Sequence, residues 1–276
     1  MSILDTIVEQ KRREVALLPE REITVEVLKA AIEARGGLRD FNGALRTPRV
    51  GSIGLIAEVK KASPSAGIIR EDFEPVAIAK EYESGGAGCL SVLTDENFFQ
   101  GSLGYLRAIR KAVDLPLLRK DFLIDERQIL EAVEAGADAI LLIVAILSDK
   151  QLKDFHDLAA GAGLAVLVEA HDAEELDRAV AAGATLVGVN NRDLKTFTVD
   201  LATTERLADR LEMEPGPEGA DARHLLVAES GIHTRADVAR LERCGAQAIL
   251  VGESLMRHAS LEAKIRELLG VDADAE

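Results

Sequence analysis

A short pattern that recurs four times in the 276-residue chain constrains its fold more than any other feature. In each copy, a Gly-Ala pair follows an amphipathic stretch and leads directly into an apolar run. The copies begin at Gly86, Gly136, Gly183 and Gly245. Glycine readily adopts the left-handed conformation that ends many helices, and an apolar run without alternation is typical of a strand buried on both faces. Each copy therefore predicts a helix followed by a buried strand.

Four further apolar runs alternate with the repeats and complete a series of eight predicted strands. They cover residues 54–59, 115–118, 164–168 and 225–228. Helical segments separate the strands, and several begin with residue pairs spaced for a capping box or a close variant of it. These pairs are Asp125 and Gln128, Ser148 and Gln151, Asp172 and Glu175, and Thr234 and Asp237. The chain therefore reads as eight strand–helix units.

Two α/β architectures fit such a series, a doubly wound open sheet and a closed barrel. The Gly-Ala pattern falls on every second unit, as expected if quarter barrels were duplicated around a ring. We therefore predict a single (β/α)8 TIM barrel over residues 51–270.

The segments outside the repeat are assigned separately. Residues 1–50 are expected to form an N-terminal helical extension packed on the barrel, because Ile3, Leu4, Ile7 and Val8 share one helical face. Residues 214–223, rich in Pro, Gly and acids, read as a surface insertion before the seventh strand. Residues 271–276 read as an acidic tail.

Charge and hydropathy exclude several classes of function. The chain has 48 acidic and 33 basic residues, and its net charge of −15 argues against a nucleic-acid partner. The longest apolar run, residues 139–147, is about half of the ~20 residues that a membrane helix needs, so no membrane association is expected. Residues 1–20 mix acids and bases, unlike a secretory leader, and we expect a cytoplasmic location.

No metal site is expected from the cysteines and histidines. Cys89 and Cys244 form no metal-binding pattern and read as small buried hydrophobes in a reduced compartment. The five histidines show no ligand spacing. His171, directly before the capping Asp172, reads as a loop or helix-start residue rather than as a catalyst.

Polar side chains follow the apolar part of several predicted strands, where a barrel of this kind carries its chemistry. Glu58 and Lys60 are two residues apart and should face the barrel mouth together. The others are Lys120, Glu169, Asn190, Glu229 and Ser230. A structural ion-pair network closing the barrel is the alternative. Because burying an ion costs several kcal/mol unless it is paired, charges on four strands favour a functional cluster with both an acid and a base.

Small residues end the last two predicted strands, as Ser230-Gly231 and Gly252-Glu253-Ser254. One such site alone would read as a tight turn. Two on neighbouring strands predict a phosphate site, since the loops after the seventh and eighth strands of barrels commonly hold phosphate.

Residues 60–67 read as a mobile lid, in which Lys60 or Lys61 could bring positive charge to an anion. Phe98 and Phe99 are expected either to pack within a loop or to form a wall against an aromatic ring.

Six segments in order resemble the motifs of the indole-3-glycerol-phosphate synthase family of tryptophan biosynthesis. Residues 56–65 read Ile-Ala-Glu-Val-Lys-Lys-Ala-Ser-Pro-Ser, and residues 118–122 read Leu-Arg-Lys-Asp-Phe. The other segments are residues 90–102, 167–171, 188–194 and 228–232. The resemblance runs from about residue 3 to residue 269, and such an ordered set is far more specific than any single motif.

This resemblance implies a ring closure of 1-(2-carboxyphenylamino)-1-deoxyribulose 5-phosphate to indole-3-glycerol phosphate, carbon dioxide and water, without a cofactor. By likeness, Lys120 is the general acid and Glu169 the general base. Lys60 holds the substrate carboxylate and Glu58 steers it, while Asn190 and Glu229 bind hydroxyls and orient the lysines. Backbone groups that bind phosphate come from Ser230, Gly231, Gly252 and Glu253, and matching pocket residues are Ser63, Phe99, Arg192, Leu194 and Leu250.

Other readings remain open on the same residues. A phosphosugar isomerase or a Schiff-base aldolase would use Lys60 or Lys120 as an amine. A non-catalytic barrel that binds an anionic metabolite is a third reading. All three imply a small anionic phosphosugar-like partner, and the chain is expected to be a monomer or a weak homo-oligomer. Glu253 stands where small residues also occur in the family, so we expect its carboxylate to point away from a phosphate.

Overall fold

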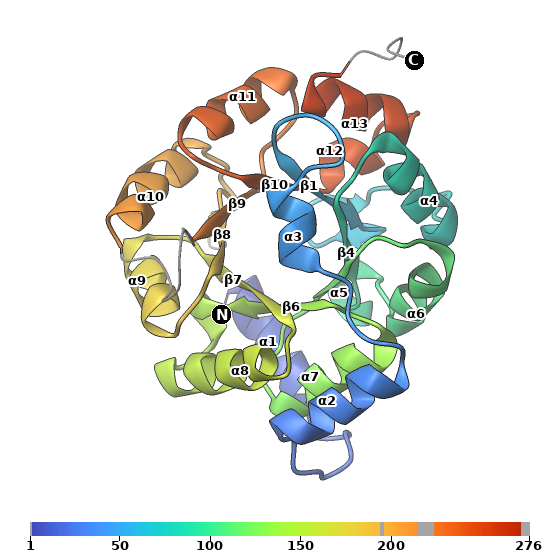
Figure 1. The fold of residues 1–276 in the computed structure, drawn as a ribbon, viewed down its shortest axis with the longest axis vertical. Coiled ribbons are helices and arrows are strands. Elements are labelled where there is room, and N and C mark those ends of the chain that lie inside the picture. The colour runs from blue at the N-terminus through green and yellow to red at the C-terminus, as the bar shows by residue number, and fades with distance from the viewer. Residues whose placement is uncertain (1, 194–195, 215–223, 272–276) are drawn as a thin grey trace.

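Eight parallel strands close into a barrel in this computed structural model, which describes residues 2–193, 196–214 and 224–271. Each strand pairs with the next along the chain, and β10 pairs with β1 (Figure 1). The strands are β1 (Gly54–Val59), β4 (Cys89–Leu93), β5 (Leu117–Lys120), β6 (Ala139–Ile143), β7 (Ala165–Ala170), β8 (Leu186–Asn190), β9 (Leu225–Glu229) and β10 (Ala248–Val251). The predicted (β/α)8 TIM barrel is confirmed, and the open-sheet alternative is wrong.

A helix follows each strand and packs on the outside of the ring (Figure 1). These helices are α4 (Pro75–Gly85), α6 (Leu103–Ala112), α7 (Glu126–Ala135), α8 (Asp149–Gly161), α9 (Ala173–Ala181), α10 (Ala202–Met213), α11 (Arg235–Arg243) and α13 (Leu261–Leu269). The four repeat glycines have φ between 93° and 104°, so the Gly-Ala pattern ends helices as predicted. Asp125, Ser148 and Thr234 form complete capping boxes.

Alternation along the strands divides the buried side chains into two layers. In β1, Ala57 and Val59 pack outward among the helices, while Ile56 packs inside the barrel. Cys89 lies in the interior layer, and Cys244 is partly buried; both thiols are free. Glu58 therefore points toward the barrel axis, as its spacing predicted.

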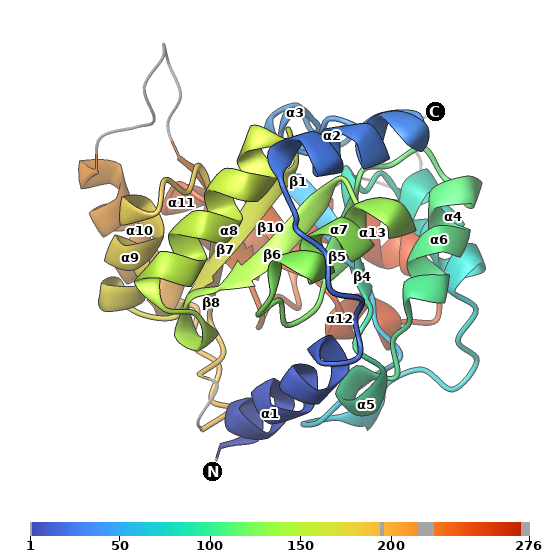
Figure 2. The same cartoon turned by 90° about the horizontal axis from the view of Figure 1, so that it is seen from below.

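Three helices precede β1. The first lies at one end of the barrel, and the second and third lie at the other end (Figure 2). They are α1 (Ile3–Val15), α2 (Val25–Ala34) and α3 (Phe41–Arg46). Phe41 and Leu45 of α3 enter the interior layer and close the amino-terminal end of the strands. Helix α1 lies at the other end, near α5 (Glu96–Phe99). One end of the barrel is therefore closed by apolar side chains, and the other holds the pocket.

Short elements decorate the pocket end. The loop after β1 forms a small hairpin of β2 (Ala62–Ser63) and β3 (Gly67–Ile68), a helical turn η1 (Val144–Ile146) follows β6, and α12 (Glu253–Met256) follows β10. The predicted insertion falls mainly on residues 215–223 and the acidic tail on residues 272–276, which lie outside the described residues. None of the described helices is long and apolar enough to cross a lipid bilayer.

Candidate active site

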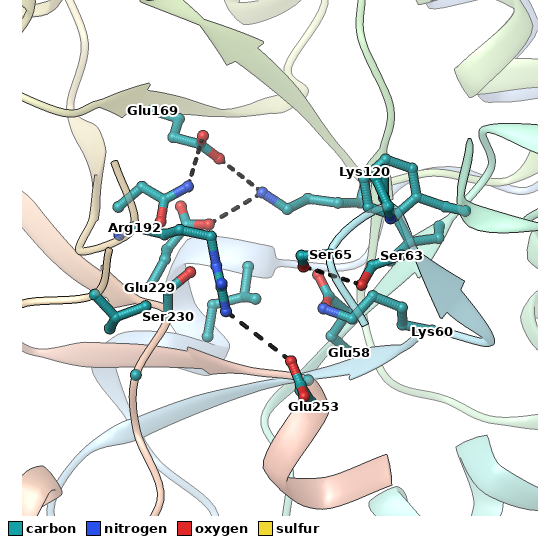
Figure 3. A pocket seen from close by; sticks show the side chains of 18 of the residues that line it. Glu58, Lys60, Ser63, Ser65, Lys120, Glu169, Arg192, Glu229, Ser230 and Glu253 are labelled. Atoms are coloured by element: carbon teal, nitrogen blue, oxygen red, sulfur yellow. Dashed lines mark hydrogen bonds and ion pairs between the residues drawn. The ribbon is translucent and has the colours of Figure 1, made fainter. Parts of the chain in front are cut away.

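A pocket opens at the carboxyl ends of the strands, and polar side chains from five of them meet in it (Figure 3). These side chains are Glu58, Lys120, Glu169, Asn190 and Glu229. Each is the last or next-to-last residue of its strand, so the strand holds its backbone while the side chain reaches the mouth. The structure therefore brings together groups that lie up to 171 residues apart, from Glu58 to Glu229.

Lys120 lies at the centre of this cluster. Its ammonium is 2.7 Å from Glu169 Oε2 and 3.0 Å from Glu229 Oε2 (Figure 3). The two carboxylates are buried, and the Lys120 side chain is only 14% exposed. Residues expected to act as acid and base thus contact each other directly.

The charges of this triad shift one another's protonation. Burial would lower the pKa of Lys120, but Glu169 and Glu229 outweigh burial and raise that pKa above its ordinary value. Burial would raise the pKa of Glu169, but the Lys120 charge lowers it well below the usual range. Burial raises the pKa of Glu229. The Lys120 charge offsets this increase only in part, and the Glu169 charge adds to the increase. Lys120 is thus a stable cation, and Glu169 is the more strongly ionised carboxylate.

A second ion pair lies on the β1 side of the pocket. Lys60 Nζ is 2.5 Å from Glu58 Oε1, and the Lys60 side chain is only partly exposed. Gly252 at the end of β10 faces this pair, since a Cβ atom there would overlap Glu58 Oε1. Glycine at position 252 therefore lets the backbone of the last strand approach Lys60 closely.

Small residues after β9 and β10 line the adjoining wall of the pocket. Ser230 has φ 66° and Gly231 has φ 80°, so two successive residues adopt left-handed backbone. Glu253, the first residue of α12, pairs with Arg257 at 2.9 Å and lies 3.9 Å from Arg192. Its carboxylate is therefore engaged by arginines, and only its backbone remains for an anion.

The remaining predicted residues line the rim and the floor. Asn190 donates to Glu169 Oε1 at 3.1 Å and accepts from the backbone of Arg192 at 3.0 Å. Ser63 lies in the β2 hairpin, and Leu250 is a buried floor residue. Phe99 lines the pocket and contacts the Phe122 ring at 5.9 Å, whereas Phe98 is not a lining residue. Leu194 lies outside the described residues.

Sequence reasoning missed two contributions to this site. Ile3, Leu4 and Ile7 of α1 line the pocket, so the apolar face of α1 covers the mouth as well as packing on the barrel. His171 lies 3.4 Å from Glu169 Oε1. The apolar spacing predicted the helix but not its location, and the two-residue spacing of Glu169 and His171 was the available signal for the histidine.

Among the described residues, no group of three or more His, Cys, Asp or Glu side chains could hold a metal ion. The lining groups suit an organic anion instead, with cationic Lys60, Lys120 and Arg192 around a partly apolar pocket. An ammonium beside a carboxylate can also serve in proton transfer, because the ammonium can donate a proton and the carboxylate can accept one.

Similar structures share the fold at low identity. The 3-hexulose-6-phosphate synthase structure matches with a TM-score of 0.59 and 17% identity, covering 80% of this chain and all of that chain. A chain of the tryptophan synthase a2b2 complex from Pyrococcus furiosus matches with a TM-score of 0.57 and 18% identity, covering 82% of this chain and 100% of its own. At such low sequence identity, these structural similarities establish only the barrel fold.

Sequence comparisons are more specific. A family model described as indole-3-glycerol phosphate synthase matches residues 4–268. The indole-3-glycerol phosphate synthase of Rhodopirellula baltica is 49% identical over 269 residues, which cover 98% of this chain and 99% of that protein. The protein of the same name from Azospirillum brasilense is 54% identical over 224 residues, covering 81% of this chain and 82% of its own. The chain belongs to the indole-3-glycerol phosphate synthase family.

Proposed function

We propose that the chain closes the indole ring of 1-(2-carboxyphenylamino)-1-deoxyribulose 5-phosphate, giving indole-3-glycerol phosphate, carbon dioxide and water in tryptophan biosynthesis. Family membership supports this reaction. The observation that carries it is the Lys120 ammonium held between Glu169 and Glu229 at the base of the pocket. A cytoplasmic location is part of the proposal and suits two free cysteines.

The substrate carries two anionic groups, a carboxylate and a phosphate. The pocket offers a cationic region for the carboxylate and a region of small residues for the phosphate. Lys60 would bind the carboxylate, and the adjacent Glu58, which pairs with Lys60, would orient the lysine. The phosphate would bind backbone N–H groups of Ser230, Gly231, Gly252 and Glu253. Phe99 and the apolar face of α1 would contact the aromatic ring, and Asn190 and Glu229 would bind sugar hydroxyls. Ser63, Arg192 and Leu250 complete the lining.

In the first step, the ring carbon that bears the carboxylate attacks the ketone carbon and a carbon–carbon bond forms. Lys120 gives a proton from Nζ to the carbonyl oxygen, which becomes a hydroxyl group. The bond to the carboxylate then breaks, carbon dioxide leaves, and its electron pair restores the aromatic ring. The carbanion-like attack is feasible because protonation removes charge from the oxygen as the bond forms.

In the second step, the new hydroxyl departs as water with a proton from an ammonium group, and Glu169 takes a proton from the methylene carbon that lies between the hydroxyl-bearing carbon and the nitrogen. The electron pair of the broken carbon–hydrogen bond forms the carbon–carbon double bond of the indole, and the nitrogen keeps its hydrogen. Carbon dioxide and water account for all the atoms lost, and no electrons leave the substrate. The reaction therefore balances without a redox cofactor, as the family resemblance implied.

The raised pKa of Lys120 opposes the Schiff-base alternatives. An imine-forming lysine must be a neutral amine, and two contacting carboxylates favour the charged form instead. A non-catalytic binding barrel would retain ligand without turnover.

One experiment separates these functions. Purified protein is mixed with the carboxyphenylamino substrate in metal-free buffer, and indole fluorescence is followed together with carbon dioxide release. We expect both signals in equal amounts, with no adduct after borohydride treatment. Ligand binding without either signal would instead indicate a binding barrel, and a borohydride-trapped adduct would indicate an imine-forming enzyme.

A further inference from the structure

His171 connects the expected general base to a second, outer carboxylate. It follows β7 directly, and its Nε2 lies 3.4 Å from Glu169 Oε1. Its Nδ1 lies 2.9 Å from Glu175 Oε2 in the first turn of α9. The ring is thus placed between Glu169 inside the barrel mouth and Glu175 outside it.

Glu175 holds both the backbone and the ring of His171. The same oxygen, Glu175 Oε2, accepts from the His171 backbone N–H at 2.8 Å. Asp172 caps α9 through the Glu175 backbone, so the Glu175 side chain is free to serve His171 instead of the cap residue. The local structure therefore fixes the direction of the imidazole.

His171 does not line the pocket, whereas Glu169 does. Glu169 has Lys120 at 2.7 Å on Oε2, and Asn190 at 3.1 Å on Oε1. His171 Nε2 lies 3.4 Å from Oε1, whereas Lys120 contacts Oε2. Any effect of His171 on the substrate must therefore pass through Glu169.

We propose that His171, fixed between Glu169 and Glu175, is a positioning residue that keeps the Glu169 carboxylate oriented and ionised while Lys120 gives up its proton. This inference rests on the proposed function and deepens it. When Lys120 protonates the carbonyl, its ammonium becomes a neutral amine and stops stabilising the Glu169 anion. The His171 charge remains beside Glu169 through that step.

The charged groups around the pair agree with this role. Glu169 faces Lys120 from β5, Glu229 from β9 and His171, while His171 faces Glu169 and Glu175. Burial would lower the pKa of His171, but the two carboxylates outweigh burial and raise that pKa to about 10. The imidazole is therefore charged at neutral pH, and its charge helps to lower the pKa of Glu169.

A helix-capping role alone would explain the Glu175 contacts but not the approach of Nε2 to Glu169. His171→Gln separates the two roles, because its amide nitrogen can replace Nε2 without carrying charge. Glu175→Gln keeps an acceptor for the backbone N–H and removes only the outer charge. His258→Gln is the matched control, since His258 is exposed and contacts Ser260.

The kinetic test measures kcat and KM from pH 3 to 9 with the carboxyphenylamino substrate, because the lowered pKa of Glu169 puts its acid limb below pH 5. For His171→Gln we expect kcat to fall about tenfold with KM nearly unchanged, and the acid limb of kcat to move upward by about one pH unit as Glu169 loses a neighbouring cation. Glu175→Gln should move the same limb by less, and His258→Gln should match the wild type. An unmoved acid limb in both His171→Gln and a folded Glu175→Gln would overturn the proposal.

A second readout needs no substrate. Ring nitrogen NMR of the full chain should show both nitrogens of His171 protonated at pH 8, and Glu175→Gln should lower the titration midpoint. A neutral His171 at pH 8 would overturn the inference even in an active enzyme. Conversely, a charged His171 in a protein without turnover would leave this pairing intact and reject the proposed function.

Discussion

Lys120 keeps its charge in a buried place because carboxylates take the place of water around it. Glu169 and Glu229 lie within 3.0 Å of its ammonium, so two negative charges share one positive charge. Burial raises the pKa of Glu229 and the Glu169 charge adds to this increase, whereas Lys120 and His171 lower the pKa of Glu169. The proposed roles of acid and base on different residues rest on this difference between the two carboxylates.

Replacing Glu229 tests that imbalance through the pH dependence of activity. Glu229→Gln removes one anion beside Lys120, so the pKa of Lys120 should fall toward its ordinary value. An acid must be protonated to act, and the basic limb of the kcat profile should therefore move to lower pH by about one unit. Glu267→Gln, on α13, is the control. A basic limb that moves upward, or stays with the control, would contradict the arrangement.

The site residues were predictable to the extent that they sit on strands. A polar residue after an apolar run marks the end of a strand, so Lys120, Glu169 and Glu229 could be assigned to one barrel mouth before any coordinates. Their mutual distances could not be predicted, because side-chain reach depends on rotamers. The contact of His171 with Glu169 was missed for the same reason, since the direction of its ring depends on its rotamer and on Glu175, four residues further along the chain.

Helix α1 is attached to the pocket end of the barrel by a buried ion cluster. Lys11 Nζ lies 2.9 Å from both Asp95 and Asp121, and 2.8 Å from Glu14. Asp121 directly follows Lys120, and Asp95 caps α5. One lysine on the helix therefore ties it to two loops of the barrel mouth.

We expect Lys11→Met to lower the free energy of unfolding by about 3–5 kcal/mol, because removing one partner leaves buried carboxylates without their cation. Urea unfolding measures this change. Arg12→Met is the matched control on the adjacent, exposed side of α1, and it should stay within about 0.5 kcal/mol of the wild type. Equal effects of the two substitutions would show that the cluster does not anchor the helix.

The existence of α1 was predictable, but its position was not. Ile3, Leu4 and Ile7 share one apolar face, which predicts burial without naming the surface that covers it. The choice of the barrel mouth depends on Lys11 reaching Asp95 and Asp121, which are 84 and 110 residues away along the chain. Such pairing is not encoded in local periodicity.

Acid stability of the whole molecule should depend on the same cluster. Burial would raise the pKa of Asp121, but Arg119 and Lys11 lower it from 3.8 to about 2. A carboxyl with a lowered folded pKa stabilises the fold above its unfolded pKa, and this contribution is lost as pH falls from about 4 to about 2. The shift corresponds to about 2 kcal/mol.

We therefore expect Asp121→Asn to destabilise the protein by a constant amount above about pH 5, and by progressively less below pH 4. Unfolding free energies from pH 2.5 to 7 measure the difference. Asp114→Asn, at an exposed position, is the control. A difference that stayed the same at every pH would contradict the lowered pKa.

The barrel itself was the most predictable feature, because its evidence is repeated. Four glycine-ended helices leading into buried strands indicated eight similar units, and the confirmed strand order returns from β10 to β1. The closure of the amino-terminal end by Phe41 and Leu45 of α3 was not predicted. These two residues join a six-residue helix to an interior layer to which all eight strands contribute, so no local pattern could show the contact.

The rate of indole formation by Lys120→Ala tests the central claim most directly, that an ammonium held by two carboxylates drives the ring closure. We predict a fall in kcat of about 10²–10⁴-fold, with an unchanged circular dichroism spectrum and product binding within about tenfold of the wild type. Lys80→Ala, at an exposed position on α4, should retain full activity. Near-normal indole formation by Lys120→Ala would contradict the claim.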